Sequence, residues 1–87
     1  MVREDEMTTW NYRVIVHDDG PGLMFAVHEV FYDGGKPTFW TENAVGAVGF
    51  TEKELRDSLA QMKLALAKPF LKEKKVRGKD RLVEYKP

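Results

Sequence analysis

The chain contains no cysteine, only four prolines and no long apolar run. Without cysteine it can form neither a disulfide nor a thiolate metal site, so the stability of so small a domain must come from packing, to which oligomerisation can add. No apolar run approaches the ~18 residues that a membrane span needs, and the charged residues 1–6 are unlike a signal peptide. We therefore expect a single domain over residues 1–87, in the cytoplasm and without membrane contact.

The motifs of common catalytic sites are also missing. Residues 46–49 precede a predicted helix but lack the spacing and the Lys-Ser/Thr pair of a phosphate-binding loop. The cluster His17-Asp18-Asp19 is typical of a turn. His28 is expected four residues along the strands from His17, about 13 Å away, which is too far for the two to share a metal ion. We predict no enzymatic activity, no metal and no cofactor.

The zero net charge conceals two oppositely charged segments. Residues 1–60 hold five Lys/Arg and eleven Asp/Glu, a net charge of −6, whereas residues 61–87 hold nine and three, a net charge of +6. The simplest interpretation is a solvated tail or one that lies against the acidic part of the chain. The alternative is a nucleic-acid contact through Lys72, Lys74, Lys75, Arg77 and Lys79.

Hydrophobic patterning predicts three strands followed by one helix. β-branched and aromatic residues favour strands over 12–17, 24–32 and 38–42, separated by a Gly/Pro/Asp cluster and by Gly34-Gly35. Thr51 and Glu54 form a capping-box pattern, and Phe50 with Leu55 a hydrophobic staple, at the start of a helix over 52–67. One apolar stripe runs along that helix, formed by Leu55, Leu59, Met62 and Leu66.

These elements predict an α+β fold, a three-stranded antiparallel meander (β-β-β-α) with one helix packed on one sheet face. Residues 81–85 alternate weakly and can add a short C-terminal edge strand or stay disordered. Residues 1–9 and 72–87 are expected to be flexible.

The two turns also predict a register. Val16 should face Phe25 and Tyr12 should face Glu29, while Glu29 should face Trp40 on the next strand. Glu29 and Trp40 then lie on the helix-facing side, where Glu29 would be a buried acid with a raised pKa. The opposite face is too apolar for solvent, and we predict an interaction surface there that includes Arg13, His17, His28, Tyr32 and Phe39.

Residues 11–71 resemble a small family of uncharacterised bacterial proteins, on the segments Tyr12-Arg13-Val14-Ile15, residues 26–32, Trp40-Thr41-Glu42-Asn43, Gly49-Phe50-Thr51, Glu54-Leu55 and Lys68-Pro69-Phe70-Leu71. More distantly, three meandering strands followed by Thr-x-x-Glu-Leu at a helix start resemble the HicB-like antitoxin fold. That resemblance implies a sheet–helix unit that binds a small toxin and oligomerises. The chain lacks the Pro-Asp pair and the C-terminal DNA-binding element of that fold.

We therefore predict a non-enzymatic protein-interaction module, antitoxin-like or regulatory, that forms homo-oligomers or binds a small protein. The alternative is a nucleic-acid-associated protein that uses the basic C-terminal segment.

Overall fold

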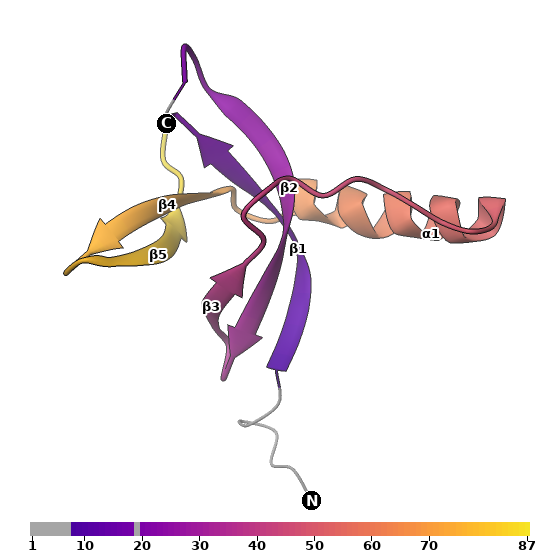
Figure 1. Cartoon of the computed structure of the whole chain (residues 1–87), viewed down its shortest axis with the longest axis horizontal. Coiled ribbons are helices and arrows are strands. Elements are labelled where there is room, and N and C mark those ends of the chain that lie inside the picture. The colour runs from indigo at the N-terminus through magenta and orange to yellow at the C-terminus, as the bar shows by residue number, and fades with distance from the viewer. Residues whose placement is uncertain (1–7, 19) are drawn as a thin grey trace, which may run out of the picture.

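The computed structural model describes residues 8–18 and 20–87. They form one five-stranded mixed sheet, one α-helix and one 3₁₀ helix (Figure 1). In chain order the elements are β1 (Thr8–His17), β2 (Met24–Asp33), β3 (Lys36–Trp40), α1 (Glu52–Lys63), η2 (Leu64–Ala67), β4 (Leu71–Val76) and β5 (Lys79–Glu84). Of residues 1–9, which were predicted to be flexible, residues 1–7 lie outside this description and residues 8–9 belong to β1.

The strand order is β3-β2-β1-β4-β5. The predicted fold, a three-stranded antiparallel meander, is wrong. β1, β2 and β3 are antiparallel neighbours, but β4 pairs parallel to β1 on its other side, and β5 pairs antiparallel to β4. Parallel neighbours require a crossover connection, and the segment of α1 and η2 supplies it. The sheet is therefore mixed.

Residues 71–84 form a β-hairpin where the sequence suggested a flexible tail. The edge strand expected over 81–85 is present as β5. Arg77 and Gly78 have φ angles of 53° and 79° at the turn, the two positive values of a type I′ hairpin. Leu71 is buried and Leu82 packs against the core, so two apolar residues anchor a strongly charged segment to the sheet.

The first predicted register is confirmed and the second is wrong. Val16 pairs with Phe25 and Tyr12 with Glu29, as expected. Between β2 and β3, however, a bulge shifts the pairing, so that Trp40 lies opposite Val30. The glycine turn itself is as predicted, with positive φ at Gly34 and Gly35. A bulge places two residues of one strand against one of its partner, and here it moves Trp40 to the opposite sheet face.

The core lies on one concave face of the sheet. Ile15, Val30 and Leu71 are its buried centre, with Tyr32, Trp40 and Leu82 packed around them. Trp40 Nε1 donates to Glu73 Oε1 at 2.9 Å, although two strands separate β3 from β4. Three strand spacings in a flat sheet amount to about 14 Å. The sheet must therefore curl around this face.

The opposite, convex face meets the helical segment only at its C-terminal end. Ala65 of η2 is fully buried, and Val14 and Val16 of β1 are nearly so. α1 continues from there away from the strands and has no buried residue (Figure 1). The expected packing of the whole helix stripe on the sheet is not observed.

Candidate interaction surface

Local interactions stabilise α1 without help from the sheet. Thr51 is the N-cap, and its Oγ1 accepts from the backbone N–H of Glu54 at 3.1 Å. The Glu54 carboxylate accepts from the N–H of Phe50 rather than from that of Thr51, so the capping box is offset by one residue. The Phe50 ring is fully exposed, and the predicted staple with Leu55 is absent. A satisfied cap is worth about 1 kcal/mol, enough to favour a helix that buries little.

Two ion pairs on the surface of α1 add to this local stability. Lys53 binds Asp57 at 3.0 Å and Arg56 binds Glu52 at 2.6 Å, both with i,i+4 spacing. Exposed pairs of this kind contribute about 0.3–0.5 kcal/mol each. The helix is thus held by its cap and surface pairs, not by core packing.

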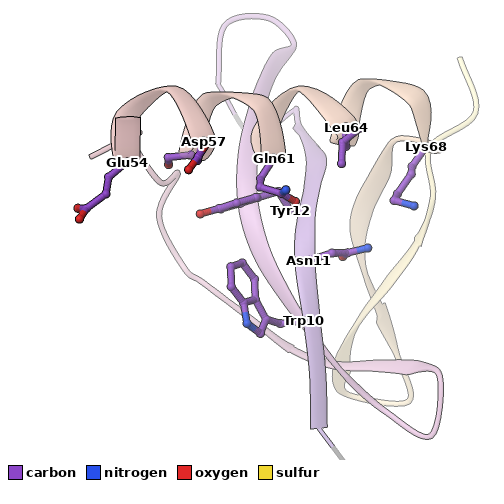
Figure 2. A pocket seen from close by; sticks show the side chains of 9 residues that line it. Trp10, Asn11, Tyr12, Glu54, Asp57, Gln61, Leu64 and Lys68 are labelled. Carbon is purple, nitrogen blue, oxygen red and sulfur yellow. The ribbon is translucent and has the colours of Figure 1, made fainter. Parts of the chain in front are cut away.

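The side of α1 that faces its own sheet is polar. Glu54, Asp57 and Gln61 face β1 across a cavity of about 580 Å³. Figure 2 shows Asp57 and Gln61 on the underside of the helix, above Tyr12 and Trp10 of β1. Leu64 and Lys68 line the end of this cavity nearer to the strands.

The apolar stripe of α1 points away from this cavity. Leu55, Leu59 and Met62 each follow a cavity-lining residue by one position, a rotation of about 100° around the helix. Leu55 is 38% exposed, Leu59 53% and Leu66 of η2 62%, whereas Met62 is half-buried. An amphipathic helix normally turns such a stripe toward a core, so most of this one lacks a packing partner within the described residues.

An aromatic row crosses the convex sheet face. Trp10, Phe31 and Phe39 are cross-strand neighbours on β1, β2 and β3, with ring centroids 6.3 Å and 5.8 Å apart. Tyr12 adds an edge-to-face contact with Trp10 at 5.2 Å. Trp10 is 49% and Phe39 65% exposed. Such pairs stabilise a sheet, but large exposed rings in one row also form an apolar patch.

The residues predicted as an interaction surface do not share one face. Phe39 is in the convex aromatic row, whereas Arg13, His17, His28 and Tyr32 occupy the concave face. There Arg13 donates to the Tyr32 hydroxyl at 3.0 Å and to the Pro69 carbonyl at 2.7 Å, and Tyr32 donates to Asn11 Oδ1 at 2.7 Å. These side chains therefore bind one another within the fold.

The two predicted members of a buried acid site are also separated. Glu29 lies on the convex side and is half-buried, while Trp40 packs in the concave core. The expected contact between them depended on the register that the bulge changes. The buried titratable side chain on β2 is instead His28, which is 1% exposed.

His28 is held between two polar partners. Its Nδ1 lies 2.9 Å from the Thr41 carbonyl and its Nε2 lies 2.9 Å from Nε2 of His17. The predicted separation of about 13 Å is wrong for the side chains, because imidazoles on neighbouring strands reach toward each other across the four-residue offset that was counted along the backbone. A carbonyl can only accept, so Nδ1 of His28 donates to Thr41, and in neutral His28 the other nitrogen, Nε2, then accepts from His17. Desolvation lowers the pKa of His28 from its ordinary value of 6.5, and the nearby His17 lowers it further. The hydrogen bond to Thr41 and the charge of Glu73 act in the opposite direction and raise the pKa.

The described residues offer little else for chemistry. Within 8–18 and 20–87, no three His, Asp or Glu side chains are grouped as a metal site would need. In the same part of the chain no helix is long and apolar enough to cross a membrane. A comparison of the chain with family models, curated proteins and solved structures finds no match.

Proposed function

We propose that this chain is a non-enzymatic, self-associating interaction module in which two copies cover each other through α1 and the convex sheet face. The observation that carries the proposal is the exposed apolar stripe of α1, turned away from its own sheet while none of the helix is buried. Apolar surface of this kind is stabilised by removal from water.

A second copy has both complementary surfaces. Each copy presents an apolar helix stripe that covers no sheet, and an aromatic sheet row that its own α1 faces only across the open cavity lined by Trp10 and Tyr12. A two-fold arrangement pairs the stripe of one with the row of the other, twice, as isologous interfaces do. Dimensions agree with this pairing. A helix of 12 residues is about 18 Å long, and the three strands of the row span about 10 Å.

The side chains suit an interface centre with a polar rim. Trp10, Phe39 and Leu59 are large apolar groups of the kind that dominate binding energy at interface centres. Lys53, Arg56 and Asp57 lie elsewhere on the surface of α1 and can remain hydrated at the rim. A small protein partner with an apolar helix would fit the same face, as the antitoxin-like role implies.

The test is the mass of the particle in solution. Sedimentation equilibrium of the full chain should give twice the chain mass, and Leu59→Glu should return it to the monomer. Ala60→Glu is the matched control, because Ala60 is exposed on the same helix but lies off the apolar stripe. A wild-type monomer at about 100 µM, where even a weak dimer would form, would overturn the proposal.

A further inference from the structure

The β4–β5 hairpin separates its charges by face. Residues directly opposite in an antiparallel pair share a face, and successive residues alternate. The inner face, which includes the core residues Leu71 and Leu82, comprises Leu71, Glu73, Lys75, Asp80, Leu82 and Glu84. The outer face comprises Lys72, Lys74, Val76, Lys79, Arg81 and Val83. Three acids and one lysine lie inside, whereas four cations and no acid lie outside.

Three of the four inner-face charges, Glu73, Lys75 and Asp80, have partners in the fold. Lys75 lies 3.7 Å from Asp80, and Glu73 accepts from Trp40 at 2.9 Å. On the outer face Lys74 is directly opposite Arg81, an arrangement of like charges that destabilises a strand pair. Among the residues that the structure describes, no ion pair neutralises an outer-face cation.

The turn adds a fifth cation at a conformational cost. Arg77 occupies the first central position of the type I′ turn with φ 53°, where Asn, Asp or Gly is preferred. A left-handed conformation is unfavourable for a long L side chain. Residues held in such conformations cluster at functional sites.

We propose that the outer face of this hairpin, with Arg77 at its tip, binds the phosphate backbone of double-stranded DNA. A two-stranded ribbon fits the major groove of B-form DNA, about 12 Å wide, but not the narrow groove of duplex RNA. The outer face of residues 71–84 carries no aromatic side chain. Phe70 and Tyr85, which continue this face at its base, pack against Phe25, so no row of free rings is available to the bases of a single strand. The hairpin projects from the strands on the side away from α1, so this inference does not rest on self-association (Figure 1).

The geometry distinguishes two adjacent lysines. Lys74 is on the outer face and Lys75 on the inner one, so the pair forms a matched test. Fluorescence anisotropy of a labelled DNA duplex, titrated with the full chain at several salt concentrations, should give a slope of log K against log salt of about −4. Lys74→Gln and Arg81→Gln should each make the slope shallower by about one unit. Lys75→Gln should leave it unchanged.

Three results would overturn the inference. The first is no binding to duplex DNA at about 50 mM salt, where phosphate contacts are strongest. The second is an equal change of the salt slope in Lys74→Gln and Lys75→Gln, which would mean that the DNA responds to the overall charge of the hairpin and not to one of its faces. The third is tighter binding to vesicles of anionic lipid, or to duplex RNA, than to duplex DNA of the same length.

Discussion

His17 and His28 are joined by a hydrogen bond between their Nε2 atoms, which lie 2.9 Å apart on the concave face of the sheet. One of these nitrogens must carry a hydrogen and the other must not. The Thr41 carbonyl accepts from Nδ1 of His28, so in neutral His28 the other nitrogen, Nε2, is the acceptor. A second proton on His28 would turn Nε2 into a donor, so that the bond survives only if His17 changes tautomer, and it would place a charge at a site that is 1% exposed.

Stability should therefore fall as the pH is lowered through the range in which histidine titrates. The pKa of His28 is lowered in the folded state, so below pH ~6.5 the unfolded chain binds more protons than the folded one. The contribution of neutral His28 is fully present above about pH 6.5 and is lost as the pH falls toward the lowered folded-state pKa. Urea unfolding between about pH 7.5 and 5.5 measures this loss before most carboxylates titrate.

Two substitutions separate this effect from others. His28→Gln removes the titrating group, so the free energy of unfolding should become nearly independent of pH in that window. His17→Gln keeps an N–H that can donate to His28 and should retain most of the pH dependence. An unchanged slope in His28→Gln would contradict the assignment.

Arg77→Asn should stabilise the chain while weakening any DNA contact. Arg77 has a φ of 53°, and Asn adopts this conformation at lower cost. We expect the free energy of unfolding to rise by about 0.5–1 kcal/mol. Gly78→Ala is the counterpart. No atom obstructs a methyl group there, but φ is 79°, so we expect the free energy of unfolding to fall by about 1 kcal/mol. Thermal unfolding of both variants measures the difference, and a loss of stability in Arg77→Asn would contradict it.

The register illustrates what the sequence can and cannot specify. The turn at Gly20-Pro21 predicted the β1–β2 pairing correctly, because a turn position determines every pair up to the first irregularity. The same reasoning failed for Trp40, because a bulge adds one residue to β3 opposite the step from Phe31 to Tyr32 of β2. The pairing beyond that step is therefore shifted by one residue. Pro37 is the one available signal, because proline within a sheet is confined to edge strands, first residues and bulges, but it does not specify which of these applies.

Substitutions in α1 and in the core should differ sharply in their effect on a single copy. Ile15→Ala removes a fully buried side chain and should cost about 2–5 kcal/mol at any concentration. Leu59→Ala changes a half-exposed side chain and should cost less than about 0.5 kcal/mol in dilute protein. If α1 covers a second copy, the cost of Leu59→Ala should grow with protein concentration. Calorimetry at two concentrations measures this, and a cost for Leu59→Ala equal to that of Ile15→Ala in dilute protein would contradict it.

The helix and the hairpin show a limit of a different kind. The spacing of apolar residues along the helix correctly predicted the stripe that includes Leu59. It does not indicate which surface packs against that stripe. The many charges of residues 72–81 suggested a flexible tail. Leu71 and Leu82, which flank this segment, instead anchor it to the core as a hairpin. Successive residues of a strand alternate between its two faces, and in this segment the acids fall on one face and most of the cations on the other. That pattern was the sequence signal from which the basic outer face could be predicted.

Trp40 connects the two ends of the curled sheet, and its removal should loosen the hairpin. Trp40→Phe loses the hydrogen bond to Glu73 and part of the packing around Val30 and Leu82, which should cost about 1–2 kcal/mol. Glu73→Gln keeps an acceptor for the indole N–H and should cost less than about 0.5 kcal/mol. Trp10→Phe is the control in dilute protein, where the proposed dimer is dissociated, because Trp10 is 49% exposed in a single copy and should change its stability little. Urea unfolding followed by circular dichroism compares all three. Equal costs for Trp40→Phe and Trp10→Phe would mean that the curl of the sheet does not depend on this contact.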